Sequence, residues 1–138
     1  MNILISACLL GVSCRYDGKS KPHEKLMSMM KSNTFIPVCP EILGGLATPR
    51  SPAEIVGNRV VNSDGLDVTK QYIRGAEEVL RICKLYDCKL AILKSNSPSC
   101  GVGRVYDGTF KGILTDGHGI CAKMLMDNGI TVLTENDI

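Results

Sequence analysis

Short apolar runs separated by long polar stretches constrain the fold of this chain most. Four runs have the composition of buried strands: residues 2–7, 35–38, 90–93 and 131–133. Apolar residues recur at helical spacing between these runs, in residues 24–31, 69–87 and 119–128. This alternation predicts an α/β fold: one domain, residues 1–138, with a Rossmann-like, mostly parallel sheet flanked by helices.

Turn residues mark two further segments. The stretch from Pro40 to Glu54 contains closely spaced prolines and a glycine pair, which predicts a long ordered loop after the second strand. Residues 58–61 and 66–68 flank an Asp-Gly pair, which predicts a hairpin. Thr69 is the expected N-cap of the helix that follows.

The composition limits the class of function. A net charge of +2 is too small to indicate nucleic-acid binding by itself, but it permits an anionic small molecule. The sequence shows neither a signal-peptide pattern nor an apolar run of about 18 residues that would span a membrane. We therefore expect a cytoplasmic protein whose seven cysteines are reduced. An odd number of cysteines favours metal binding or thiol chemistry over a closed disulfide framework.

Three cysteines follow predicted strands. Cys8 ends the first run, Cys39 follows the second, and Cys100 lies in the loop after residues 90–93. Parallel strands bring their carboxyl ends to one edge of the sheet, where open α/β sheets bind ligands. Three thiolates from three loops at that edge predict a metal or cluster site.

The ligand set has open alternatives. Cys14 lies close behind Cys8 and is a candidate to replace it, or to act as a reactive thiol nearby. Close cysteine pairs of the zinc-ribbon type are absent, and His118 is expected to be an exposed or capping residue. A cluster with one iron free of protein ligands is an alternative to zinc, because such an iron binds soft atoms such as sulfur. The remaining cysteines are expected to be incidental or in the core: Cys83, Cys88 and Cys121.

Several longer motifs are similar to those of a known family. They are Ser6–Gly11, Cys14–Gly18, Cys39–Glu41, Gly44–Leu46, Thr48–Arg50, Pro52–Glu54 and Ser97–Gly101. Together they resemble the DUF523 family, which includes thiouracil desulfidases, and the match covers nearly the whole chain.

The resemblance implies a [4Fe-4S] cluster held by Cys8, Cys39 and Cys100. It also implies removal of sulfur from thiolated uracil compounds, such as 4-thiouridine monophosphate or thiouracil, by non-redox hydrolysis of the C–S bond. The family's catalytic acid and serine would fall among three residues: Glu41, Ser97 and Ser99. Longer relatives that act on tRNA carry a second domain that is not seen here, so tRNA is not the expected substrate.

Cations in the same loops are candidates to bind a phosphate or ribose. The predicted substrate-binding residues are Arg15, Arg50 and Lys94, since cationic side chains pair with phosphate. Glu54 is an alternative, structural partner for Arg50. Two other functions stay open: a structural zinc- or metal-binding module without catalysis, and a dithiol redox protein that uses Cys8 and Cys14.

Overall fold

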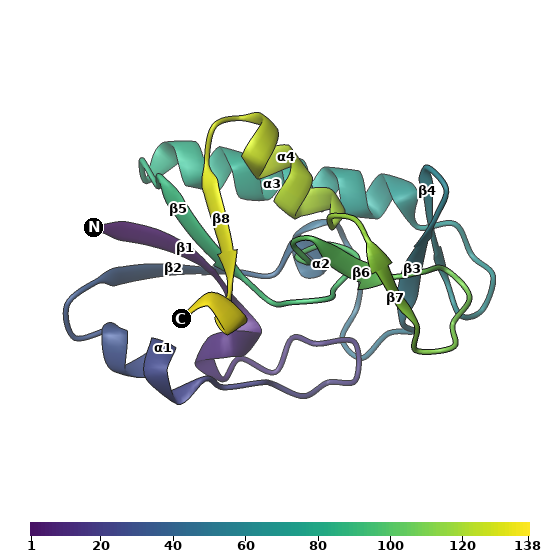
Figure 1. Ribbon diagram of the computed structural model, residues 1–138, viewed down its shortest axis with the longest axis horizontal. Helices are drawn as coiled ribbons and strands as arrows, with labels where there is room; N and C mark the ends of the chain where they lie inside the picture. Colours follow the sequence, from purple (N-terminus) through teal and green to yellow (C-terminus); the bar gives the residue numbers. More distant parts are fainter.

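The computed structural model describes all 138 residues and is built around one four-stranded sheet (Figure 1). The strands lie in the order β2 (Thr34–Val38), β1 (Asn2–Ser6), β5 (Leu90–Leu93), β8 (Thr131–Thr134). All neighbouring strands run parallel. The predicted α/β fold with a parallel sheet flanked by helices is confirmed.

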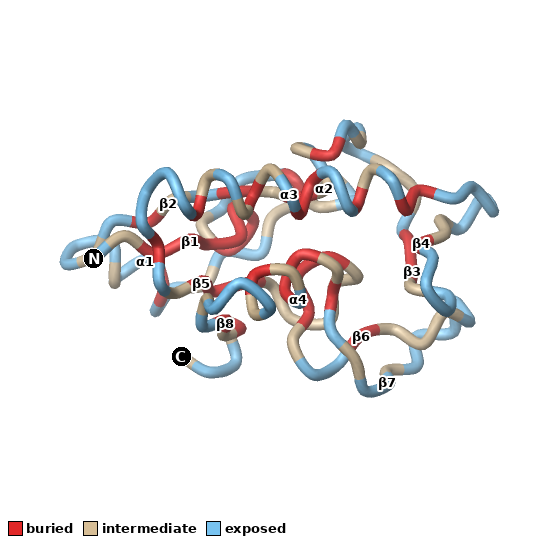
Figure 2. The backbone as a smooth tube through the Cα atoms, turned by 90° about the horizontal axis from the view of Figure 1, so that it is seen from above, coloured by how far each residue is buried: buried red, intermediate tan, exposed pale blue.

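Helices cover both faces of the sheet, and this explains why its strands are apolar on both sides. The helices α3 (Thr69–Leu85) and α4 (Ile120–Asp127) cover one face, and α1 (Glu24–Met29) lies on the other (Figure 1). Alternate residues of β1 serve the two sides: Leu4 joins the α3–α4 core, whereas Ile3 and Ile5 join the core on the α1 side. Figure 2 shows the buried positions gathered along the strands and the inner sides of α3 and α4. No helix combines the length and apolar character that a membrane span requires.

Smaller elements lie beyond the carboxyl ends of the strands (Figure 1). A short helix, α2 (Pro40–Leu43), follows β2 directly. One hairpin pairs β3 (Ala53–Val56) with β4 (Arg59–Asn62), and another pairs β6 (Arg104–Tyr106) with β7 (Leu114–Asp116). Two 3-10 turns, η1 (Ala7–Leu10) and η2 (Glu135–Asp137), follow β1 and β8.

Three local predictions differ from the structure. The predicted loop 40–54 contains α2 and the start of β3, because Pro40 occupies the first helical position, where its missing N–H costs nothing. The predicted 58–61/66–68 hairpin forms only in part, and the longer ladder is the β3–β4 hairpin, which turns at Gly57, whose φ is 62°. Only a single bridge, Val61 to Asp67, forms across the Asp-Gly pair.

The N-cap of α3 also differs. Val68 occupies the cap position, and Thr69 is the first helical residue. The hydroxyl of Thr69 is engaged elsewhere, because it accepts a hydrogen bond from the backbone N–H of Val60 at 2.8 Å. The Thr69 side chain thus ties α3 to β4 instead of capping its own helix.

The helices α2 and α3 come into direct backbone contact at two glycines. A Cβ atom at Gly44 would collide with the carbonyl oxygen of Gln71, and one at Gly75 would collide with that of Pro40. Only glycine permits this approach. The contact fixes α2, and with it the chain from Cys39 onwards, against the longest helix of the molecule.

Candidate metal and substrate site

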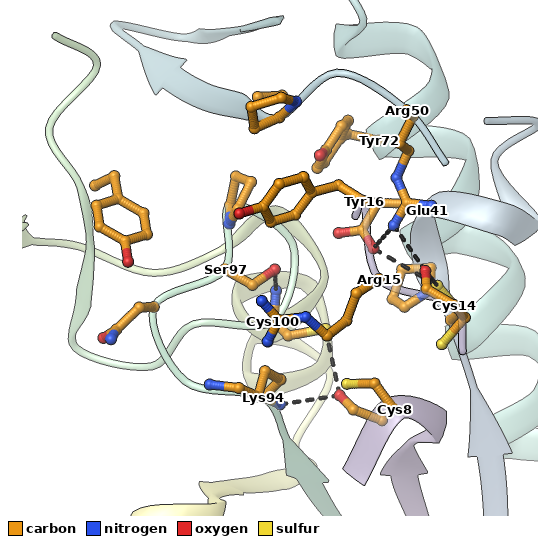
Figure 3. Close-up of a pocket in the computed structure, with 18 of the residues that line it drawn as sticks. Cys8, Cys14, Arg15, Tyr16, Glu41, Arg50, Tyr72, Lys94, Ser97 and Cys100 are labelled. Atoms are coloured by element: carbon orange, nitrogen blue, oxygen red, sulfur yellow. Dashed lines mark hydrogen bonds and ion pairs between the residues drawn. The ribbon is translucent and has the colours of Figure 1, made fainter. Parts of the chain in front are cut away.

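A cavity of about 420 Å³ lies where β1, β2 and β5 end. Its walls come from the loops after these strands and from the added hairpins. Figure 3 shows the labelled side chains around it. The residues that line the cavity include every predicted metal-ligating, catalytic and substrate-binding residue except Ser99: Cys8, Cys39, Cys100, Glu41, Ser97, Arg15, Arg50 and Lys94.

The predicted cysteines reach the cavity from three separate elements. Cys8 lies in η1 after β1, Cys39 joins β2 to α2, and Cys100 lies in the loop after β5. Cys14 also lines the cavity, from the loop after η1. Three of these thiols are buried and Cys39 is half-buried, and all four are free. The site therefore holds one thiol more than the predicted ligand set.

Three of the thiols, those of Cys14, Cys39 and Cys100, have a raised pKa and keep their protons more firmly than ordinary cysteines. The hydrogen bond with the Cys14 thiol, burial and the Glu41 carboxylate all raise the pKa of Cys39. For Cys14, the hydrogen bond with Cys39 lowers the pKa, but the nearby Cys8 and burial outweigh this effect and raise the pKa to about 11. Burial and Glu41 raise the pKa of Cys100 to about 12. A bound cation would have to deprotonate these thiols, as metals do to their cysteine ligands.

A hydroxyl group points at one of the sulfurs. The Ser6 hydroxyl donates to Cys100 Sγ at 3.5 Å, and Ser6 Oγ accepts the backbone N–H of Lys94 at 2.9 Å. Ser6 is buried at the end of β1. Because its acceptor side is occupied by the neighbouring strand, its proton is directed to the sulfur. Ser6 was given no role from the sequence, although it begins the first cysteine motif, Ser6–Gly11.

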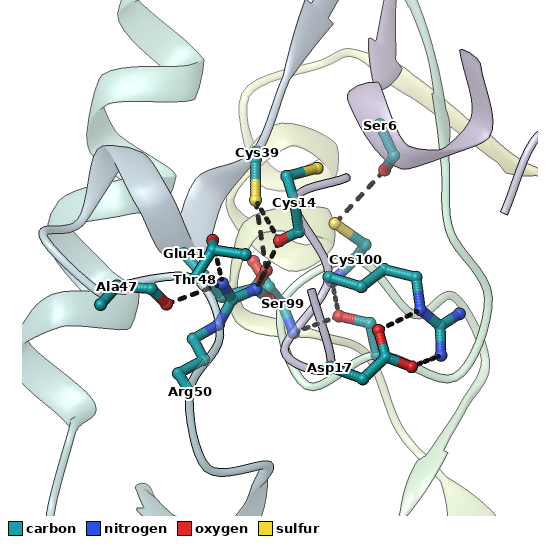
Figure 4. A network of polar contacts seen from close by, with 12 residues as sticks. Ser6, Cys14, Asp17, Cys39, Glu41, Ala47, Thr48, Arg50, Ser99 and Cys100 are labelled. Atoms are coloured by element: carbon teal, nitrogen blue, oxygen red, sulfur yellow. Dashed lines mark hydrogen bonds and ion pairs between the residues drawn. The ribbon is translucent and has the colours of Figure 1, made fainter. Parts of the chain in front are cut away.

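Glu41 and Arg50 form a buried ion pair beside the thiols (Figure 4). Arg50 Nη2 lies 3.0 Å from Glu41 Oε2, and both side chains are about nine-tenths buried. The Cys39 thiol donates to the same carboxylate oxygen at 3.6 Å. Burial raises the pKa of Glu41, while the Arg50 charge opposes the rise. The carboxyl group thus lies between a thiol and a guanidinium, at the wall of the cavity.

The guanidinium of Arg50 is already well supplied with partners. Besides Glu41, it donates to the carbonyl oxygens of Cys14 and Ala47 and to the hydroxyl of Thr48. Four hydrogen bonds from one side chain leave little capacity for a phosphate. Glu54, the alternative partner from the sequence, instead accepts backbone N–H groups of a neighbouring loop. Arg50 thus holds the cavity wall together, and its predicted substrate-binding role stays a prediction.

The two predicted serines have different surroundings. Ser97 lines the cavity, and its Oγ accepts the backbone N–H groups of Ser99 and Cys100, both at 3.1 Å. Ser99 is fully buried, and its hydroxyl has no hydrogen-bond partner and does not line the cavity. The structure brings Ser97 to the cavity and leaves Ser99 behind it.

The other two cations lie at the cavity with partners of their own. Arg15 Nε is 3.4 Å from Asp17, and its guanidinium lies 5.8 Å from the ring centre of Tyr16. Lys94 Nζ is 2.8 Å from Glu135 of η2. Exposed fractions of about a fifth leave both side chains accessible to an anionic ligand.

Residues predicted to be uninvolved lie away from the cavity. Cys83, Cys88 and Cys121 are buried in the core beside α3 and α4, and His118 is exposed. Nowhere in the structure do three His, Cys, Asp or Glu side chains converge closely enough to hold a single metal ion.

This chain is similar to known proteins in sequence and in fold. A family model described as 2-thiouracil desulfurase matches residues 3–137. The uncharacterized protein YbbK of Bacillus subtilis (strain 168) is 40% identical over 146 residues, which cover 99% of this chain and 97% of that protein. The solved structure of a [4Fe-4S]-dependent thiouracil desulfidase, TudS, is 44% identical, with a TM-score of 0.94 over 99% of this chain and 92% of the other.

Proposed function

The chain belongs to the 2-thiouracil desulfurase family, and from that premise we propose that it is a [4Fe-4S]-dependent desulfidase acting on thiolated uracil compounds. The observation that carries this proposal is the meeting of three strand-end cysteines and Glu41 at one cavity. TudS, the similar solved protein, is named for the same cofactor and activity. The seven free cysteines fit a reducing compartment, so we place the protein in the cytoplasm.

The donor set fits an iron–sulfur cluster. Cys8, Cys39 and Cys100 would hold it, with Cys14 as the candidate to replace Cys8. Thiolates are the ligands that such clusters take, and each thiolate binds a different iron, so the sulfurs need not converge as they must around a single ion. The Ser6 hydroxyl aimed at Cys100 supports the assignment, because a hydroxyl donor is better used by a thiolate than by a thiol.

When bound, the cluster supplies an iron without a protein ligand, a Lewis acid that is soft enough to accept a thiocarbonyl sulfur. Glu41 is the group that moves a proton to or from the attacking water. Arg50 holds the carboxylate in place during that transfer. Ser97 has its hydroxyl proton free for the edge of the pyrimidine, since its oxygen already accepts two N–H groups.

The overall reaction needs no electron transfer. Water replaces sulfur at the carbon: the C=S group becomes C=O, and sulfur leaves as hydrogen sulfide. The substrate is a free thiolated base or a nucleotide such as 4-thiouridine monophosphate. Arg15 and Lys94, at the cavity, are the residues proposed to bind its phosphate, and tRNA is not proposed as a substrate.

The test is anaerobic reconstitution followed by incubation with 4-thiouridine monophosphate and with 2-thiouracil. We expect the thiocarbonyl absorbance to fall and sulfide to appear, with about four irons per chain. Cys8→Ser, Cys39→Ser and Cys100→Ser should each abolish turnover and lower iron content, whereas Cys14→Ser should keep both. A colourless protein with stoichiometric zinc would favour a structural metal module. Loss of activity in Cys8→Ser and Cys14→Ser, with Cys39→Ser and Cys100→Ser still active, would favour dithiol chemistry.

A further inference from the structure

Aromatic residues are few in this chain and gather at the cavity. The sequence has four tyrosines, two phenylalanines and no tryptophan. Four of these six residues line the cavity described above: Tyr16, Tyr72, Tyr106 and Phe110. Phe110 is 39% exposed, so its ring gains only part of the burial that a core position would give. Packing alone therefore does not account for its place.

The backbone of Phe110 is strained. Its φ is 59°, in the left-handed region, which disfavours side chains with a Cβ atom. The other non-glycine residues with positive φ are Asp87 and Asn96, types that tolerate this conformation through their short polar side chains. A phenylalanine has no such compensation. Residues held in this way cluster at ligand-binding sites, where the surrounding structure imposes the strain.

A buried acid imposes the conformation. Glu54 Oε1 accepts the backbone N–H of Gly108 at 2.9 Å and that of Phe110 at 3.1 Å. The same loop lies close on β3: a Cβ atom at Gly108 would be 2.7 Å from the carbonyl oxygen of Ile55. Contacts with β3 thus fix the loop between β6 and β7, and Phe110 of this loop lines the cavity.

We propose that Phe110 is a substrate-binding residue whose ring stacks on the planar heteroaromatic ring of the substrate. The inference rests on the proposed function for the identity of that ring, a thiolated pyrimidine. Glu54 is the corresponding positioning residue, because it acts on the substrate only through the loop that carries Phe110. The protein tolerates the strained backbone at Phe110 because the substrate needs a stacking surface at this part of the cavity wall.

Four substitutions separate stacking from packing. Phe110→Ala and Phe110→Leu remove the ring, Phe110→Tyr keeps it, and Phe110→Gly removes both the ring and the backbone strain. We expect Phe110→Ala, Phe110→Leu and Phe110→Gly to raise KM about tenfold with kcat nearly unchanged, and Phe110→Tyr to resemble the wild type. Tyr86→Ala is the matched control, since this half-exposed ring at the end of α3 does not line the cavity.

Stability gives a second, independent readout. In cluster-free protein, Phe110→Gly should melt at a higher temperature than Phe110→Ala, by about 3 °C, because only glycine relieves the positive φ. A residue kept for packing would show a large loss of stability in both variants and an unchanged KM. That pattern would overturn the proposal.

Equilibrium binding separates this proposal from the proposed function. Calorimetry with uracil, the product ring, on reconstituted wild type and on Phe110→Leu measures affinity without turnover. Wild-type binding that is weakened about tenfold in Phe110→Leu supports the stacking role even if no sulfide forms, an outcome that would contradict only the desulfidase function. Equal affinity in the two proteins, or no binding to the wild type, overturns the stacking role.

Discussion

At the scale of single residues, a buried hydroxyl beside a sulfur is the most informative contact. Ser6 links the backbone of β5 to Cys100, so it helps to fix both the loop and the electron density on the sulfur. Groups that hydrogen-bond to a ligand atom, without touching the metal, tune its affinity and redox potential. Ser6 therefore belongs to the proposed site although it does no chemistry.

Ser6→Ala should lower iron affinity about tenfold and make the cluster easier to lose. Removal of the hydroxyl also leaves the Lys94 N–H without its acceptor, which should destabilise the cluster-free fold by about 1–2 kcal/mol. Iron release to a chelator and the reduction potential measure the first effect, and urea unfolding measures the second. Ser28→Ala, on an exposed face of α1, is the control. An unchanged potential with unchanged iron release would contradict the assigned role.

The pair of Glu41 and Arg50 gives a second prediction at this scale. Arg50→Met leaves a buried carboxylate without its partner and should cost about 3 kcal/mol of stability. In Glu41→Gln/Arg50→Met, the buried charge is absent and part of that loss should be recovered; the rest remains because Arg50 also donates to Cys14, Ala47 and Thr48. Urea unfolding of the four proteins in a double-mutant cycle yields the coupling free energy. Additive losses would mean that the two side chains do not interact.

The position of the three cysteines could be predicted from the sequence, but the hydrogen bonds around them could not. Cys8, Cys39 and Cys100 could be placed because an apolar run predicts a strand, and parallel strands share an edge. Arg50 was predicted to bind a substrate phosphate. Its hydrogen bonds to the carbonyl oxygens of Ala47 and Cys14 could not be predicted, because no local sequence pattern shows that these segments come together.

At the scale of elements, the contact between α2 and α3 determines where the second cysteine loop lies. Gly75 sits inside a 17-residue helix, where intrinsic propensity would favour alanine by about 1 kcal/mol. The structure requires the opposite, because the carbonyl of Pro40 occupies the space of a Cβ atom.

Gly75→Ala should therefore destabilise the protein by about 2 kcal/mol instead of stabilising it, and should displace α2. Because Cys39 and Glu41 move with α2, iron retention should fall as well. Glu77→Ala, on the exposed side of α3, tests propensity without the contact and should be neutral or slightly stabilising. A gain of stability in Gly75→Ala would show that the two backbones can separate at little cost.

The long periodic elements were predictable and the short ones were not. The helix and strand patterns of residues 69–85 and 90–93 are strong, so these elements appear close to their predicted bounds. The β3–β4 hairpin was missed because its strands are short, whereas the Asp64-Gly65 pair gave the stronger local turn signal but closes only one bridge.

At the scale of the whole molecule, the core contains ionisable groups. Burial, together with the neighbouring Cys88, raises the pKa of Cys83 to about 11, and burial raises that of Cys121 well above its ordinary value. The folded chain keeps these protons above the pH at which the unfolded chain loses them. Stability from this source is complete below about pH 9 and is lost as the pH rises through the folded pKa.

The cluster-free protein should accordingly lose stability between pH 8 and pH 10, by about 1.4 kcal/mol per pH unit above 9 for each such thiol. Urea unfolding in the presence of a reductant measures the loss. In Cys83→Ala the loss over this interval should be smaller by about 1 kcal/mol. An identical loss would mean that the Cys83 thiol titrates alike in both states.

The anchoring of the site by the last strand has a consequence for biosynthesis. Glu135, directly after β8, accepts the N–H and the hydroxyl of Ser95 and pairs with Lys94, so it fastens the loop that leads to Cys100. β8 is also the only neighbour of β5 on that side. On the ribosome, a nascent chain lacks this fastening until residue 135 has emerged. We therefore expect the chain to take up its cluster only after residue 135 has emerged, and a chain truncated before β8 to retain little iron.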